Sequence, residues 1–391
     1  MTDTDTTDID SNGIDTTDTG TPATRPAPAR FGRRLPGADR ARAFTEPPAP
    51  AGRPASQPAL TDVLADPDTA PAAADEVLSW ERFADPSTDV LSDGGWEPPP
   101  PPEPPAQWGP RAAVLRVLSF GLAKPRPGQA ELAYRRDVRT IRQATWPRSV
   151  RVAVANPKGG SGKTPTAVLL GGVLASVRGG SVAIWDASDA AGTLGSRTEG
   201  TAARCVSDIA ADPDAYALPS TVGMVAATQT SFADVLGSLR EREFTGPDIT
   251  AVLDVLDATY RVSVADSGNV PHSAAFEALI GRADILVVPT TLTADSVNKA
   301  VALLRRLQAA PAGLAQRAVV AVLDTKGPRT PGLAGQLEKI FAAVGVGAVV
   351  HLPFDPHIGA CTALSMGALS HDSLVAWTRL AATTVANLTV T

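Results

Sequence analysis

The feature that most constrains the fold is a glycine-rich loop between an apolar run and a helical pattern. The apolar run covers Val150–Ala155, and the loop after it reads Asn156-Pro157-Lys158-Gly159-Gly160-Ser161-Gly162-Lys163-Thr164. Glycines let the backbone N–H groups of such a loop approach phosphates closely, and the N-terminus of the following helix adds partial positive charge. A strand, a glycine-rich loop and a helix in this order predict a nucleotide phosphate site.

The side chains and the backbone of this loop have distinct expected roles in holding the phosphates of ATP. Lys163 is expected to reach the β- and γ-phosphates, and the hydroxyl of Thr164 to bind Mg²⁺. The other loop residues expected to contact phosphate are Lys158, Gly159, Gly160, Ser161 and Gly162. The site therefore predicts ATP and Mg²⁺ as cofactors.

Strand-like and helix-like patterns alternate from Ser149 to the end of the chain. The predicted strands are Val150–Ala155, Ser181–Trp185, Val222–Ala226, Val262–Ala265, Ile285–Val288, Ala318–Leu323 and Ala348–Leu352. Several are apolar throughout, as expected for strands covered on both faces. The predicted helices include Pro165–Val177, Asp295–Gln308 and Leu333–Val344. This alternation predicts an α/β domain over residues 149–391, with helices flanking a mainly parallel sheet.

The composition of the N-terminal part differs from that of the rest. Twenty of the 35 prolines lie in the first 110 residues, and the first twenty residues carry six Asp and no basic residue. Residues 1–108 are therefore predicted to be a disordered tail, acidic at first and then rich in Pro, Ala and Arg. Within it, Glu97–Pro105 is predicted to form polyproline II, which serves as a stiff spacer or as a ligand for a partner protein.

Residues 109–148 are predicted to form a basic helical extension. Between Arg111 and Arg151 there are ten Lys or Arg residues and two acidic residues. Four arginines recur there at helical spacing: Arg135, Arg136, Arg139 and Arg142. Such a face suits the phosphates of nonspecific DNA, and equally a solvated surface or a surface that docks on the acidic tail.

Cysteine content and hydropathy exclude several classes of protein. Cys205 and Cys361 form no C-x-x-C pair, so neither a disulfide framework nor a metal cluster is expected. The chain has no apolar run of eighteen residues and no apolar N-terminal leader, so no membrane span and a cytoplasmic location are expected. The last predicted helix, Ser373–Leu388, carries only one cation, which favours a packing helix over a membrane-binding one.

The string K-G-G-S-G-K-T at Lys158–Thr164 resembles the deviant Walker A loop of the ParA/MinD family of ATPases. The resemblance implies a P-loop NTPase fold of the SIMIBI type and ATP hydrolysis within a homodimer. It also implies that Lys158 reaches across the dimer to the phosphates bound by the partner. A lysine supplied in trans would stabilise the charge that develops in the transition state.

Two further segments match the switch regions of that family. Asp186 follows the predicted strand Ser181–Trp185, and the resemblance implies that it organises Mg²⁺ and its waters. The second aspartate of the family motif is replaced by Ser188, so Asp189 is expected to position the attacking water, or else hydrolysis is slow. Asp266 follows Val262–Ala265 and is expected to hold Mg²⁺ through water, as a Walker B carboxylate does.

Residues near the expected base site and at the start of the helix after the loop can also be compared with the family. Asp324 stands near the position where the family reads adenine, and Pro353 opens a loop, Pro353–Pro356, that resembles the loop that closes over the base. Pro165 departs from the family, which usually has Thr there, and removes an N–H that commonly faces the α-phosphate. Thr166 is expected to compensate for that loss.

The order of segments along the chain resembles one branch of the ParA/MinD family in particular. The Pro-rich tail, the basic segment from Trp108 and the strings Gly192-Thr193-Leu194 and Pro353–Pro356 look like the MinD-like ATPases of actinobacterial type VII (ESX) secretion, the EspI-type proteins. The leading hypothesis is an ATP-driven dimerisation switch that acts on a secretion or positioning partner. The alternatives are a ParA-type partition ATPase that binds nonspecific DNA and a nucleotide-binding scaffold that hardly turns over.

Overall fold

The computed structural model describes residues 104–109, 118–119, 124–188, 192–200, 205–238, 244–308 and 313–388. They all belong to one unit, Pro101–Thr391. The predicted tail before residue 104 and the predicted catalytic residue Asp189 lie outside the described residues. Within the described ranges, no helix combines the length and the apolar composition that crossing a bilayer requires.

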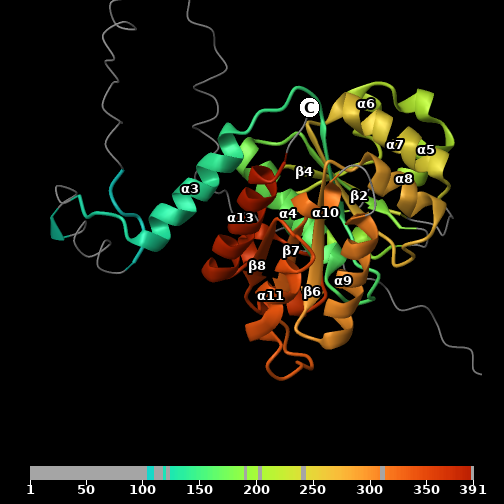
Figure 1. The fold of residues 1–391 in the computed structure, drawn as a ribbon. Helices are drawn as coiled ribbons and strands as arrows, with labels where there is room; N and C mark the ends of the chain where they lie inside the picture. Colours follow the sequence, from blue (N-terminus) through green and yellow to red (C-terminus); the bar gives the residue numbers. More distant parts are fainter. Residues whose placement is uncertain are drawn as a thin grey trace, which may run out of the picture. The chain divides into compact units, whose positions relative to one another are not determined.

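An eight-stranded sheet organises the described residues, in the order β3-β4-β2-β5-β1-β6-β7-β8 (Figure 1). The strands are β1 (Val150–Val154), β2 (Val182–Ala187), β3 (Ala227–Thr228), β4 (Ala233–Leu236), β5 (Val262–Ser267), β6 (Ile285–Thr291), β7 (Val319–Leu323) and β8 (Ala348–Leu352). Every pairing is parallel except that of β3 with β4. The predicted fold class, a mainly parallel sheet flanked by helices, is confirmed.

Helices cover both faces of the sheet because the strands alternate between two buried clusters. Ala153 of β1 packs into a cluster with α5, α7, α8, α9 and α11, while Val152 and Val154 pack into a cluster with α3, α4 and α13. Figure 1 shows α7 beside α8, and α3 beside α13. The helices are α3 (Gln129–Gln143), α4 (Lys163–Arg178), α5 (Val206–Ala211), α6 (Pro219–Val222), α7 (Gly246–Thr259), α8 (Ala274–Arg282), α9 (Ala294–Gln308), α10 (Leu314–Arg317), α11 (Leu337–Ala342), α12 (Pro356–Gly359) and α13 (His371–Ala386).

Four short 3₁₀ helices connect these elements: η5 (Leu194–Arg197), η6 (Pro213–Tyr216), η7 (Ala334–Gln336) and η8 (Met366–Ala368). The predicted helix Leu333–Val344 is divided between η7 and α11. The last predicted helix corresponds to α13, which packs into the core through Trp377 and Leu380. The interpretation of this segment as a packing helix is confirmed.

The predicted strand Val222–Ala226 is wrong. Val222 ends α6, and Gly223–Val225 form the turn after it. The strand of the sheet is β4, further along the chain, whose Ala233–Leu236 pairs in parallel with β2. A short apolar run does not distinguish a buried helical turn from a strand, since both bury the same side chains.

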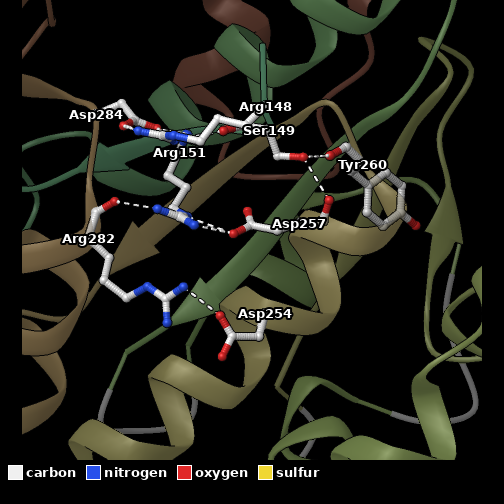
Figure 2. A network of polar contacts seen from close by, with 8 residues as sticks. All are labelled: Arg148, Ser149, Arg151, Asp254, Asp257, Tyr260, Arg282 and Asp284. Atoms are coloured by element: carbon white, nitrogen blue, oxygen red, sulfur yellow. Dashed lines mark hydrogen bonds and ion pairs between the residues drawn. The ribbon is translucent and has the colours of Figure 1, made fainter. Parts of the chain in front are cut away.

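An ion-pair network fixes the start of β1, at the edge of the sheet opposite the glycine-rich loop (Figure 2). Asp284 is buried and accepts from both terminal nitrogens of Arg148, at 2.7 and 3.0 Å, and from the amide of Arg151 at 2.8 Å. The guanidinium of Arg151 pairs with Asp257, and Ser149 donates to the carbonyl oxygens of Asp257 and Tyr260 at 2.7 and 2.6 Å. These contacts join β1, α7 and the entry to β6.

Asp284→Ala should lower the free energy of unfolding by about 2–4 kcal/mol, because it leaves a buried amide and a guanidinium without their acceptor. Asp254→Ala is the matched control. Asp254 also pairs with an arginine, Arg282, but its side chain is 60% exposed, so a loss of less than about 1 kcal/mol is expected. Urea denaturation of both variants measures the difference, and equal losses would contradict the role given to Asp284.

Candidate functional site

Among the described residues, a cavity of about 1010 Å³ opens at the carboxyl ends of the parallel strands. This edge is where ligands bind in open α/β sheets, and the volume is that of a small-molecule site. Its walls include residues from the glycine-rich loop, from the ends of β5, β6, β7 and β8, and from the segment after β2. The cavity therefore gathers segments that lie far apart in the chain, from Gly160 to Trp377.

The loop Asn156–Gly162 has the backbone geometry that its glycines predict. Gly162 caps α4 with φ 94°, a conformation that strains any other residue, and a Cβ there would lie 2.6 Å from Cδ2 of Leu323, so that side chain would have to shift. Asn156 is buried and anchors the loop, since its Nδ2 donates to the carbonyl oxygen of Pro289 at 2.8 Å and its Oδ1 accepts from the amide of Lys158 at 2.9 Å. The loop is thus tied to the end of β6.

Lys163 lies at the start of α4 with its ammonium inside the cavity wall. Its Nζ donates to Oδ1 of Asn269 and to the carbonyl oxygen of Lys158. Burial lowers the pKa of Lys163, and the nearby carboxylate of Asp266 opposes that shift. Asn269 follows the Walker B segment, and sequence reasoning missed it because an asparagine in a loop has no signal of its own.

The predicted metal ligands lie together at the end of β5. The hydroxyl of Thr164 donates to Oδ2 of Asp266 at 2.6 Å, and Thr193 lies 3.3 Å from the same hydroxyl. Asp186 and Asp266 occupy paired positions on the adjacent strands β2 and β5. Burial, with a further contribution from the charge of Asp186, raises the pKa of Asp266 to about 7 against donation from Thr164, and burial also raises the pKa of Asp186.

The segment after β2 closes against Asp186. A Cβ on Gly192 would lie 1.9 Å from Oδ2 of Asp186, so only glycine allows this approach. Ser188 lines the cavity and donates to Oδ1 of Asp186 through its amide at 3.1 Å and through its hydroxyl. Ser188, which stands where the family has its second aspartate, therefore holds Asp186, which matches the first.

Lys158 points away from the phosphate loop toward α9. Its Nζ pairs with Oδ2 of Asp295 at 2.7 Å, and the two side chains are 43% and 57% exposed. The hydrogen bond from Lys158 lowers the pKa of Asp295. The lysine expected to act in trans is thus held in cis by an exposed carboxylate.

The base side of the cavity is lined by the ends of β7 and β8. Asp324 lines it while paired with Arg329, and Lys326 lies 4.8 Å from the ring centroid of Phe354. Asp355 holds the loop that begins at Pro353: it accepts from the amide of His357, and from the amide and hydroxyl of Ser370, each at 2.9 Å. Burial would raise the pKa of Asp355, but these donors and Ser373 bring it to about 2.

Thr166 is not among the residues that line the cavity. It is fully buried, its amide donates to the carbonyl oxygen of Gly162, and its hydroxyl has no hydrogen-bond partner among the described residues. Pro165 does line the cavity. The structure therefore does not bring Thr166 to the wall where it was expected to compensate for Pro165.

The residues present fit a magnesium nucleotide. Oδ1 of Asp266 is buried and has no hydrogen-bond partner, so one oxygen of this carboxylate is available to a metal ion. Among the described residues no group of three or more His, Cys, Asp or Glu side chains forms a metal cage. Mg²⁺ commonly binds through one or two carboxylates and takes its remaining ligands from phosphates and water, so Thr164, Asp186 and Asp266 suit that arrangement.

Asp266→Asn should stabilise the protein at neutral pH when both Mg²⁺ and nucleotide are absent. The folded-state pKa of about 7 lies above the unfolded value of 3.8, so folding is favoured while the carboxyl is protonated. That contribution fades as the pH rises from about 4 to about 7. At pH 8 the variant should exceed the wild type by about 2–4 kcal/mol in free energy of unfolding, and near pH 4 the two should agree.

Urea denaturation at several pH values in a chelating buffer measures this difference. Asp214→Asn, at an exposed aspartate of η6, is the control and should leave the pH profile unchanged. A wild type that does not lose stability relative to Asp266→Asn as the pH rises would contradict the burial of this carboxylate.

Comparisons with known proteins agree with the resemblance of the loop. The chain is 25% identical over 232 residues to the ESX-1 secretion-associated protein EspI of Mycobacterium tuberculosis, in strains CDC 1551 and H37Rv. The match covers 56% of this chain and 34% of EspI, so the chain spans about a third of the length of these relatives. No family model matches the chain.

The similar solved structures include a ParA family ATPase and MinD. A ParA family ATPase from Chlorobium tepidum is 17% identical with a TM-score of 0.47, covering 54% of this chain and 85% of that one. MinD from Pyrococcus horikoshii, in complex with Mg-ADP, is 15% identical with a TM-score of 0.44, covering 60% and 94%. Both TM-scores lie below 0.5, and the site residues of this chain carry the argument on function.

Proposed function

We propose that this chain binds ATP with Mg²⁺ in the cavity at the carboxyl edge of the sheet and hydrolyses it slowly. The observation that carries the proposal is the bond from Thr164 to the buried Asp266, made at the N-terminus of α4 beside the ammonium of Lys163. This set offers a cation, a helix N-terminus and two carboxylates around one cavity of nucleotide size.

Each residue has a role in this proposal. The backbone of Gly159–Gly162 donates to the phosphates, and Lys163 leaves Asn269 to pair with the β- and γ-phosphates. Thr164, Asp186 and Asp266 hold the metal, which supplies charge neutralisation at the phosphates. Asp324 and the loop from Pro353 bind the base, and Asp189 positions water. Ser188, which is bound to Asp186, carries no carboxylate, and this supports slow turnover.

We further propose that ATP drives formation of a homodimer in which Lys158 acts in trans. The pair with Asp295 supports a resting state, because two exposed side chains exchange partners at little cost. When a second copy presents its nucleotide, the ammonium would leave the carboxylate for the phosphates. The similarity to EspI and the Pro-rich tail support a role in type VII secretion through a protein partner that the tail recruits.

Mass measurement by light scattering, with and without ATP and Mg²⁺, tests the switch. The wild type should form dimers with ATP, and Lys158→Ala should bind ATP yet remain monomeric. Lys163→Ala should lose ATP binding itself. Asp295→Ala should dimerise at several-fold lower protein concentration, since its Lys158 is already released. Lys339→Ala, at an exposed lysine of α11, is the control and should behave as the wild type. Monomers of the wild type at saturating ATP would refute the switch.

A second candidate function, ATP-dependent binding of nonspecific DNA, is favoured by one observation on α3. Arg136, Arg139 and Arg142 are all exposed along it, whereas Arg135 is occupied by Glu131 and by the carbonyl oxygens of Pro104 and Pro105. Three exposed arginines at this spacing fit a phosphate backbone.

If this candidate is right, replacing the three exposed arginines by Gln should weaken duplex binding. It should also reduce the slope of log binding constant against log salt concentration by about three. Fluorescence anisotropy with a short duplex, ATP and a salt series measures the effect. Arg135→Gln is a poor substitute for this test, because it breaks the contacts with Glu131. Failure of the wild type to bind duplex at low salt with ATP would rule this function out.

A further inference from the structure

One cation of the cavity, Arg197, has no part in the roles given above. It ends η5, a 3₁₀ helix that begins just after Thr193, and it lines the same cavity as Lys163 and Thr164. Its Nη2 donates to the carbonyl oxygen of Ile358 at 3.2 Å, and its own carbonyl oxygen accepts from the amide of Leu364 at 2.8 Å. Arg197 therefore connects the segment after β2 with the wall after β8.

The guanidinium of Arg197 has an unused donor. Its Nε is buried and has no hydrogen-bond partner, and no carboxylate in the described part of the chain pairs with the side chain. A guanidinium stays charged at every ordinary pH, and a buried donor without an acceptor costs free energy. The side chain also lines the cavity, and a guanidinium at a cavity wall without a carboxylate partner is suited to an anionic ligand.

The first turn of α4 lacks a hydrogen-bond donor. Pro165 lines the cavity and has no N–H, so the helix N-terminus offers one donor fewer than an ordinary phosphate-binding helix. Thr166, the next residue, does not line the cavity and its amide is used within the helix. Since η5 packs on α4 and both residues line the cavity, the guanidinium of Arg197 and the position of the missing donor lie on neighbouring elements of one wall.

We propose that Arg197 is a nucleotide-binding residue that contacts the phosphate nearest the first turn of α4, in place of the N–H that Pro165 removes. This rests on the proposed binding of ATP. The contact would also link the phosphates to the wall after β8, because the same side chain is tethered to Ile358. Arg197 then determines both the affinity of the site and its preference for phosphorylated ligands.

A double-mutant cycle on the full chain tests this inference. Arg197→Met, Pro165→Thr and the double variant are compared with the wild type by calorimetric titration of ATP in Mg²⁺. Arg197→Met should weaken ATP binding by about ten- to a hundredfold, as expected for a lost hydrogen bond to a charged group. In the Pro165→Thr background the loss should be several-fold smaller, because the threonine amide restores the donor. Arg197→Lys should recover part of the affinity.

Two further measurements separate ligand contact from a structural tie to Ile358. Adenosine, measured as a competitor, should bind Arg197→Met and the wild type equally, because it has no phosphate. Lys339→Met removes an exposed cation that does not line the cavity and should leave ATP affinity unchanged. Thermal unfolding without ligand checks that each variant folds. If Arg197→Met does not fold, Arg197→Lys is compared instead, in the wild type and in Pro165→Thr.

The outcomes are distinct for the two proposals. A wild type that does not bind ATP overturns the proposed function. A wild type that binds ATP, with Arg197→Met binding it equally well, overturns the role of Arg197 alone. Equal losses for ATP and adenosine, or equal losses in both Pro165 backgrounds, also overturn it, since they indicate a purely structural arginine.

Discussion

The register of β1 against β5 is the constraint on which the rest of the site depends. It sets Val154 level with Asp266, so the loop that leaves β1 begins beside the carboxylate that ends β5. Asn156 then ties the loop to β6, and Gly162 turns the chain into α4 within contact of Leu323. A shift of one residue would turn each strand side chain to the other face and separate Thr164 from Asp266. At the far end of β1, Asp257 of α7, the helix that leads into β5, binds Arg151 and Ser149 and helps to hold that register.

The site keeps charges in an environment that disfavours them. Burial raises the pKa of Asp266 and of Asp186 and lowers that of Lys163, so the ligand-free state is less stable than its packing alone allows. The magnesium nucleotide proposed for this site would supply the opposite charge to both carboxylates and to the lysine. Binding energy is therefore linked to the relief of these buried charges, and ligand should stabilise the fold markedly.

The sequence predicts features that depend on local chemistry and misses those that depend on packing. The glycine-rich loop, Asp266 at a strand end and the parallel sheet follow from patterns within a few residues, and the sheet is confirmed. Val222–Ala226 was wrong because its burial comes from α6, and β4 was missed because Asp234 interrupts its short apolar run. No sequence pattern marks Asn269 or Asp295, because only the fold brings Asn269 to Lys163 and Asp295 to Lys158.

The three basic groups near the loop differ in how firmly the fold holds them, and this difference fits different tasks. Lys163 and Arg197 belong to the cavity wall, and each donates to a main-chain carbonyl oxygen of that wall, so they suit a ligand bound in the same chain. Lys158 is tied only to an exposed carboxylate, and an exposed pair contributes little to stability. It can therefore change partners without disturbing the fold. A residue that must reach a second copy needs that freedom, whereas a residue that completes the ligand's own cavity must not have it.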